Sequence, residues 1–144
     1  MADYWKESPP ILREFLNYHE SILSHSAQTV DEYFLDLRGF FRYLKMTRNP
    51  DLADVPFQEI SILDVDLDFV SKTQLSEIYG FLTFLTGGGA FGKAESTTRA
   101  RKCASIRSFY NYLCVHARVM TADPTQALNN PKMRKSLPRY LSLT

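Results

Sequence analysis

Apolar side chains recur every three or four residues through most of the chain, a spacing typical of amphipathic helices. In the N-terminal half this pattern predicts two helices, over about residues 8–24 and 26–47. The first begins with Ser8-Pro9-Pro10, because serine caps helices well and proline fits the first helical position. The second ends before Arg48-Asn49-Pro50. The apolar positions of the first helix are Ile11, Leu12, Phe15, Leu16 and Ile22. Those of the second are Val30, Tyr33, Phe34, Leu37, Phe40, Phe41 and Leu44.

Two further helices are predicted in the C-terminal half. The third begins at Ser71, where Gln74 three residues later completes a capping-box pattern, and the run Gly87-Gly88-Gly89 ends it. The fourth spans about residues 96–117. The buried stripe expected for the third helix is Leu75, Ile78, Tyr79, Leu82 and Leu85. The stripe expected for the fourth is Cys103, Ile106, Phe109, Tyr110 and Leu113.

The remaining segments are rich in residues that break helices. Residues 51–68 are acidic and contain Pro56, which favours a loop with one turn of helix at most. Asp123-Pro124 is typical of a helix start and predicts a short fifth helix. No run alternates long enough for a sheet. We therefore predict an all-α, compact bundle of four to five helices over residues 1–129, followed by a linker over residues 130–144.

The composition agrees with one soluble domain. The chain has 144 residues, of which 44% are hydrophobic and 23% charged. No apolar run approaches the length of about 20 residues that crosses a membrane. The N-terminus lacks the basic and then apolar pattern of a signal peptide. We expect a cytoplasmic protein with no membrane partner.

The net charge of +1 conceals a strong asymmetry. Residues 1–92 carry seven Lys/Arg and fourteen Asp/Glu, whereas residues 93–144 carry ten Lys/Arg and two Asp/Glu. A basic C-terminal third on a nearly neutral chain favours a face that binds a polyanion such as nucleic acid. The alternative at this level is a basic helix and tail that are merely solvated.

Motifs for catalysis and for metal binding are absent from the sequence. It contains no GxGxxG, P-loop, HExxH, CxxC or nucleophile elbow. Asp64, Asp66 and Asp68 alternate, but they lack the glycine and the terminal glutamate of a calcium-binding EF-hand, so an ordinary acidic loop is favoured. Cys103 and Cys114 are too far apart on one helix to pair. We expect no metal and no cofactor.

The fourth helix carries the clearest candidate binding surface. When successive residues are placed 100° apart around the helix, a polar stripe lies opposite the apolar stripe. Arg107 borders this polar stripe. Small side chains beside a cation allow a helix to approach a DNA groove while arginine reaches a phosphate or a guanine edge. The polar stripe comprises Thr97, Arg101, Ala104, Ser108 and Asn111. A surface helix with ordinary solubilising charges is the alternative.

Two neighbouring segments add to this surface. Ser96, Thr97 and Thr98 place hydroxyls and free backbone amides at the start of the fourth helix, where phosphate binds well, and Lys93 before them adds charge. Gln28 and Thr29, at the start of the second helix, are either neighbours of a helix cap or contacts to a second stretch of DNA backbone.

Three stretches of the chain carry motifs that occur together in one known family. The first, in the second helix, is Thr29, Tyr33, Asp36-Leu37, Phe40 and Leu44. The second, in the fourth helix, is Thr97, Arg101 and the run Ser105-Ile106-Arg107-Ser108-Phe109-Tyr110. The third, near the C-terminus, is Asp123-Pro124, Pro131-Lys132, Leu137-Pro138 and Leu141-Ser142. In this order they resemble the tyrosine recombinase (site-specific integrase) family, and the Xer-type recombinases and phage or transposon integrases in particular, where the third stretch leads into the catalytic domain.

The resemblance implies a SAM-like four-helix fold, the N-terminal core-binding domain, which forms one half of a C-shaped clamp around DNA. By similarity, DNA faces Thr97, Arg101, Ser105 and Arg107 of the fourth helix and Gln28 and Thr29 of the second. Also by similarity, the linker side chains Lys132, Arg134 and Lys135 follow the DNA backbone.

In full-length members of the family a separate domain supplies an Arg, Lys, His, Arg, His/Trp and Tyr set, whose tyrosine attacks a phosphate. We expect this chain to end where that domain begins. It would then be a non-catalytic domain with double-stranded DNA and other recombinase protomers as partners, and with no small-molecule substrate.

Two other functions remain open from the sequence. A helical protein–protein interaction or oligomerisation domain could pair the acidic N-terminal half, with Glu14, Glu20, Asp31 and Glu32, with the basic face of a second copy. A free-standing transcription regulator would need a helix-turn-helix with a short glycine turn, which the long loops disfavour. Two departures from the family are the acidic segment 51–68 and the glycine-rich run 87–92.

Overall fold

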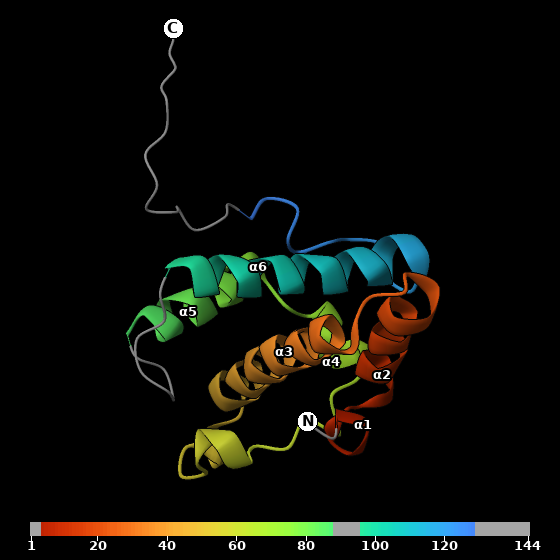
Figure 1. The fold of residues 1–144 in the computed structure, drawn as a ribbon. Coiled ribbons are helices and arrows are strands. Elements are labelled where there is room, and N and C mark those ends of the chain that lie inside the picture. The colour runs from red at the N-terminus through yellow and green to blue at the C-terminus, as the bar shows by residue number, and fades with distance from the viewer. Residues whose placement is uncertain (1–3, 88–95, 129–144) are drawn as a thin grey trace, which may run out of the picture.

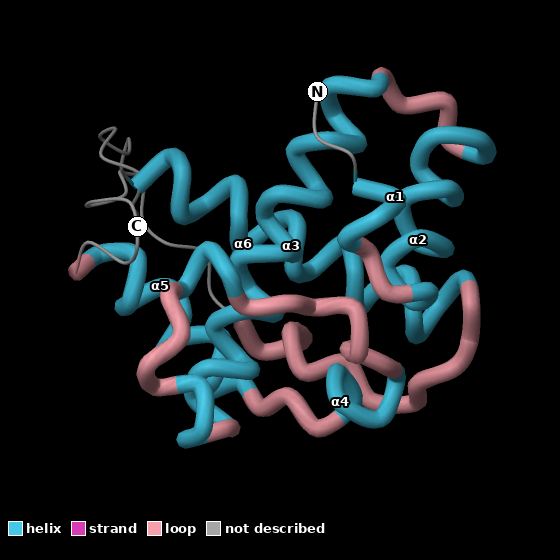
Figure 2. The backbone as a smooth tube through the Cα atoms, turned by 90° about the horizontal axis from the view of Figure 1, so that it is seen from below, coloured by secondary structure: helices cyan, strands magenta, loops and turns pink. Residues whose placement is uncertain are grey.

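The computed structural model of the chain describes residues 4–87 and 96–128, and in these residues it contains helices and loops but no strand (Figures 1 and 2). The predicted all-α bundle is therefore confirmed. The α-helices are α1 (Tyr4–Glu7), α2 (Pro10–Asn17), α3 (Ala27–Arg48), α4 (Leu67–Ser71), α5 (Leu75–Thr86) and α6 (Ser96–Asn111). The π-helical turns are η1 (Tyr18–Ile22) and η4 (Tyr112–His116), and the 3-10 turns are η2 (Pro50–Leu52) and η3 (Phe57–Glu59).

Helix α3 is the centre of the bundle. It has 22 residues and packs against α2, α5 and α6 (Figure 1). Its start is fixed by Ser26, whose hydroxyl accepts a hydrogen bond from the Thr29 backbone N–H at 3.1 Å. The broad apolar stripe predicted from its sequence explains this central position, because a helix that is apolar over much of its circumference must be covered on several sides.

Aromatic rings fill the space between α2, α3, α5 and α6. The Phe15 ring of α2 meets the Phe109 ring of α6 edge to face, with centroids 5.4 Å apart. Phe41 of α3 meets Phe109 in the same manner at 5.4 Å, and Phe40 meets Phe81 of α5 at 5.4 Å. All five of these side chains are buried. Truncating a buried phenylalanine to alanine costs about 3–5 kcal/mol, so this cluster fixes how α6 sits on α3.

The first helix is shorter and differently capped than its sequence predicts. Pro9 is the N-cap of α2, and the buried Ser8 hydroxyl has no hydrogen-bond partner among the described residues, so the predicted Ser8 cap is wrong. The helix continues through η1 to Ile22, close to the predicted end, but Ile22 is exposed and not part of the core. The short helix α1 was not predicted.

The third helix begins later than predicted. Its N-cap is Gln74, whose backbone N–H donates to the Glu77 carboxylate at 2.9 Å, and Ser71 instead ends α4. The capping-box prediction was thus displaced by three residues. The buried face also differs from the predicted stripe, because Tyr79 is exposed and Phe81 occupies the core with Ile78 and Leu82.

The segment between α3 and α5 is more ordered than the single turn predicted from its acids and Pro56. It contains η2, η3 and α4, and Ile60, Ile62 and Val65 are buried against the helices. The Arg42 guanidinium of α3 donates to the Ile60 carbonyl at 2.9 Å, which anchors the segment to the bundle. Apolar residues inserted among the acids therefore override the loop-like composition.

Asp123-Pro124 begins a turn and not the predicted fifth helix. The Asp123 carboxylate accepts hydrogen bonds from the Thr125 backbone N–H at 2.8 Å and from its hydroxyl at 2.6 Å. The backbone N–H of Leu128 then donates to the Thr125 carbonyl. This local side-chain bonding satisfies the backbone without a helix. The predicted linker over residues 130–144 lies outside the described residues.

Candidate nucleic-acid interface

The buried side of α6 is the one predicted from its apolar stripe. Its five stripe residues are buried, and α6 lies against α3 at one edge of the bundle (Figure 1). The Tyr110 hydroxyl donates to the Val70 carbonyl at 2.8 Å and so ties α6 to α4. Burial raises the pKa of Tyr110 far above its ordinary value. This tyrosine is a structural group that stays protonated.

The opposite side of α6 combines small and cationic side chains. Thr97, Arg101, Ala104 and Asn111 are exposed, and Ser108 is half-buried. An open groove of about 600 Å³ runs between this face and the turn after Asp123. Its lining residues are Ala100, Ala104, Arg107, Ser108, Asn111, Asp123, Thr125 and Gln126. Three residues of the predicted polar stripe, Ala104, Ser108 and Asn111, therefore line this groove, whereas Thr97 and Arg101 lie on the same face outside its lining.

A buried carboxylate on α3 organises the cations of α6. Asp36 is 1% exposed, and its Oδ1 accepts hydrogen bonds from Arg101 Nη2 at 2.9 Å and from Lys102 Nζ at 3.0 Å. Its Oδ2 accepts a hydrogen bond from the Ser105 hydroxyl at 2.6 Å. We call these four residues the Asp36 cluster. Ser105, which was expected to face DNA, is buried at 2% exposure and points to Asp36 in this structure.

Asp36 belongs to the family pattern noted in the sequence but was not predicted as a residue of the candidate site, although a signal was present. This acid lies within the apolar stripe of α3, between Tyr33 and Leu37. An aspartate in such a position needs cationic or hydroxyl partners on the helix that covers it, because a buried charge without partners is costly. The basic helix α6 supplies those partners.

Arg107 lies beside the exposed face and holds the chain after α6. Its guanidinium donates to the Leu128 carbonyl, so it fixes the last described residue against the helix. Arg107 is half-buried, unlike the exposed Arg101.

The other predicted contact residues lie on different segments. Gln28 is exposed and Thr29 half-buried in the first turn of α3, two helical turns before Asp36. The Thr29 hydroxyl accepts a hydrogen bond from the Ser26 hydroxyl at 3.0 Å. Lys93, Lys132, Arg134 and Lys135 lie outside the described residues.

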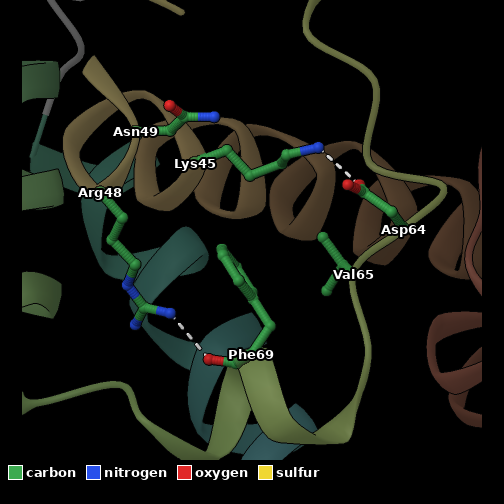
Figure 3. A pocket seen from close by; sticks show the side chains of 6 residues that line it. All are labelled: Lys45, Arg48, Asn49, Asp64, Val65 and Phe69. Carbon is green, nitrogen blue, oxygen red and sulfur yellow. Dashed lines mark hydrogen bonds and ion pairs between the residues drawn. The ribbon is translucent and has the colours of Figure 1, made fainter. Parts of the chain in front are cut away.

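A second group of cations lies at the far end of α3 but is engaged within the fold. These cations line a pocket of about 190 Å³. Figure 3 shows that Lys45 points to Asp64 and Arg48 to the Phe69 carbonyl. Arg48 also donates to both carboxylate oxygens of Glu77, at 2.8 and 2.9 Å. Its guanidinium lies 4.4 Å from the centre of the Phe69 ring. Lys45 and Arg48 therefore stabilise the fold through these contacts.

The pKa of Glu77 reflects this pairing. Burial alone would raise it, but the hydrogen bonds from Arg48 and from the Gln74 backbone, together with the Arg48 charge, lower it below its usual range. The ionised form of Glu77 is therefore the stable one in the fold, and it serves both Arg48 and the cap of α5.

Histidines meet at the junction of η1 and α6. His19 is buried, with its Nδ1 3.0 Å from His25 Nδ1 and its Nε2 3.3 Å from the Ser108 hydroxyl. Burial, followed by the charges of His25 and His116, lowers the pKa of His19 to about 4. This histidine is neutral near pH 7, and the described residues contain no group of three or more side chains suited to hold a metal ion.

The three alternating aspartates each have a structural role. Asp64 pairs with Lys45, and Asp68 pairs with Lys72 at 3.0 Å. Asp66 caps α4 by accepting from the Phe69 backbone N–H at 2.9 Å. They act separately, but not in the plain loop expected from the sequence, since Asp66 caps α4 and Asp68 lies within that helix. Within residues 4–87 and 96–128, no helix is both long and apolar enough to cross a membrane.

The chain is similar over most of its length to curated tyrosine recombinases. It is 44% identical over 135 residues to the tyrosine recombinase XerC of Caldanaerobacter subterraneus subsp. tengcongensis, a match covering 94% of this chain and 37% of that protein. It is 32% identical over 132 residues to XerC of Myxococcus xanthus, covering 92% of this chain and 36% of that protein. It is 29% identical over 133 residues to XerD of Listeria monocytogenes serotype 4b, covering 92% of this chain and 37% of that protein.

The fold and the candidate face define an all-helical domain with one basic outer helix. The comparisons make this chain a relative of the tyrosine recombinases, and the resemblance predicted from its motifs is confirmed. The chain spans little more than a third of the length of the relatives it matches. No family model matches it, and no solved structure matches it.

Proposed function

We propose that this chain binds duplex DNA as the non-catalytic N-terminal clamp domain of a tyrosine recombinase that acts in DNA recombination and integration. The observation that carries the proposal is the outer face of α6, where the exposed Arg101 lies among the small exposed residues Thr97 and Ala104. The similarity to recombinases supports it, because such proteins must hold the DNA that they recombine.

The proposed contacts are mainly to phosphates. Arg101 offers a planar guanidinium that matches a phosphate, Thr97 offers a hydroxyl, and Ala104 leaves room for the sugar–phosphate chain to approach α6. Gln28 and Thr29 contact a second stretch of backbone in this proposal. Outside the described residues, Lys93, Lys132, Arg134 and Lys135 extend the basic surface along the sequence.

Catalysis is assigned in this proposal to parts of the recombinase beyond this chain. Among the described tyrosines, Tyr110 is buried and bonded to the Val70 carbonyl, and burial raises the pKa values of Tyr43 and Tyr112. A tyrosine that attacks a phosphate needs nearby cations that stabilise its ionised form, which is the opposite effect.

The test is a fluorescence-anisotropy titration of the 144-residue chain with a duplex of about 30 base pairs, roughly three helical turns, at low and moderate salt. Binding should weaken steeply with salt, because each neutralised phosphate contributes a slope of about −0.9 to the plot of log K against log salt. Absence of binding by the folded chain at low salt would contradict the proposal.

Two variants locate the surface. Arg101→Ala should weaken binding about fivefold, as expected for one phosphate contact worth about 1 kcal/mol, and should flatten the salt slope by about 1. Lys72→Ala removes an equal charge from the acidic half of the chain, where Lys72 pairs with Asp68, and should leave affinity almost unchanged. Equal losses in both variants would mean that net charge, and not the α6 face, governs binding.

A role in protein–protein interaction is supported by a separate observation. The exposed apolar residues of the described chain include Ile22 and Leu23 at the end of η1 and Val115 and Val119 at and after η4. These two turns are neighbours, since the Tyr18 and His116 rings lie 5.0 Å apart. Contact with another protomer through this area is compatible with DNA binding by α6. Analytical ultracentrifugation of the wild-type chain and of Ile22→Ser, without DNA, would test it.

A further inference from the structure

We propose that Asp36 is a positioning residue for DNA binding, which holds the basic side chains of α6 in the arrangement that meets the duplex. The inference rests on the proposed function above and deepens it. Asp36 itself cannot touch DNA, because it is 1% exposed and lies beneath α6. Its effect must therefore pass through the side chains that it binds.

The Asp36 cluster is graded from the core to the surface. Ser105 is buried, the Lys102 side chain is 18% exposed, and the Arg101 side chain is 48% exposed. The carboxylate divides its oxygens between them, with Oδ2 taking the buried hydroxyl and Oδ1 taking both cations. The core end of the cluster is thus fixed, while its outer end remains accessible to a ligand.

The charges of the cluster leave an excess on the outside. One carboxylate faces two cations, so the group as a whole stays positive. A guanidinium carries five N–H groups, so the bond from Arg101 to Asp36 can coexist with a bond to a phosphate. Asp36 therefore orients Arg101 without neutralising the surface that α6 presents.

Orientation has a direct effect on affinity. A free arginine side chain samples many rotamers, and ordering it on a phosphate opposes binding. Arg101 is already held at one N–H group by a carboxylate that is itself fixed by Ser105. DNA then meets a side chain that loses little further freedom.

The sign of the effect separates positioning from simple electrostatics. Removing the Asp36 charge makes the chain more basic by one unit, which by long-range attraction alone would tighten binding to DNA. Loss of positioning acts in the opposite direction and weakens binding. Asp36→Asn is suited to this test, because the amide oxygen can still accept a hydrogen bond from the Ser105 hydroxyl.

The experiment measures affinity of the 144-residue chain for the same duplex at one fixed salt concentration. The matched control is Glu32→Gln, which removes an equal charge one helical turn earlier on α3. We expect Asp36→Asn to bind about fivefold more weakly than wild type and Glu32→Gln to bind equally or somewhat more tightly. The double variant Asp36→Asn/Arg101→Ala should lose less than the product of the two single losses, because Asp36 acts partly through Arg101.

A folding control and a second variant keep the outcome clear. Circular dichroism should report the same helical content for Asp36→Asn as for wild type at the titration temperature. If Asp36→Asn has less helix than wild type, Ser105→Ala is the test instead. This variant removes one hydrogen bond of the Asp36 cluster without changing the charge, and we expect it to bind the duplex about twofold more weakly. Equal affinity for wild type and Ser105→Ala would then overturn the proposal.

The proposed function and the role of Asp36 fail in different ways. If the wild-type chain does not bind the duplex, both are overturned. If wild type binds, and Asp36→Asn binds as tightly as Glu32→Gln or more tightly, the positioning role is overturned and DNA binding stands.

Discussion

Two charged clusters join α3 to its neighbours, and they are built in opposite ways. In the middle of α3 a buried acid, Asp36, holds cations that reach the surface. At its C-terminal end a cation, Arg48, is held between Glu77, Thr73 and the Phe69 carbonyl. The position of the acid therefore decides whether the cation is available to a ligand or stabilises the fold. An acid in the core leaves arginine available outside, whereas an arginine surrounded by acceptors supports the fold.

The largest effect should come from breaking the cluster around Arg48. Arg48→Ala removes the hydrogen bonds to Glu77, Thr73 and Phe69 and leaves the half-buried Glu77 without its cation. We expect a loss of about 2 kcal/mol in the free energy of unfolding, less than the 3–5 kcal/mol typical of fully buried pairs. Urea denaturation would measure it. DNA affinity of the folded variant should stay unchanged, and a loss of affinity with intact stability would reverse the roles of the two clusters.

The next largest effect should appear when the free energy of unfolding is measured as a function of pH. It comes from His19, which stays uncharged in the fold beside α6. The pKa of His19 is lowered from 6.5 to about 4 in the fold, so between these values the unfolded chain binds a proton that the folded chain does not. Stability is therefore fully present above pH 6.5 and falls as the pH drops towards 4. We expect a loss of about 1–2 kcal/mol at about pH 5, partway down this range.

The histidine effect can be isolated by difference. His19→Gln has no imidazole to protonate, so its unfolding free energy should vary less between pH 6.5 and 4.5 than that of wild type. Glu77, whose pKa is lowered in the fold, is present in both proteins, so its contribution to the pH dependence cancels in the difference. Parallel pH profiles for the two proteins would assign the dependence to other groups.

The smallest effect on stability should come from the Asp36 cluster. Arg101→Ala leaves Lys102 and Ser105 on the Asp36 carboxylate and removes a side chain that is half exposed. We expect about 0.5–1 kcal/mol, similar to other partly exposed ion pairs. Its cost should add to that of Arg48→Ala, since 12 residues of helix separate Asp36 from Arg48 by about 18 Å. Strong non-additivity in urea denaturation would mean that the two clusters form one network.

Periodicity predicted the helices that position the candidate site. The stripes of α3 and α6 are long and regular, and the rings at Phe41 and Phe109 are buried where the pattern placed them. Local cap patterns were less decisive. Ser71 and Gln74 compete as starts of α5, and the contact of Glu77 with Arg48, 29 residues away, selects the later one.

Only part of the candidate site could be predicted from the sequence. The polar face of α6 follows from angular spacing, so Thr97, Arg101 and Ala104 were placed correctly on an exposed stripe. The pairing of Asp36 with that helix depends on how α3 and α6 cross, which one-dimensional spacing does not encode. Likewise, the burial of Ser105 follows from its position directly above Asp36.

The Asp36 cluster also has an evolutionary consequence. Three side chains of α6 share the carboxylate of Asp36 on α3, so a change at position 36 alters the surroundings of all three at once. In descendants of a common ancestor, loss of the acid should therefore be accompanied by substitutions at Arg101, Lys102 and Ser105. An aspartate within the stripe of one helix and an Arg-Lys-x-x-Ser run on another would be inherited as one unit.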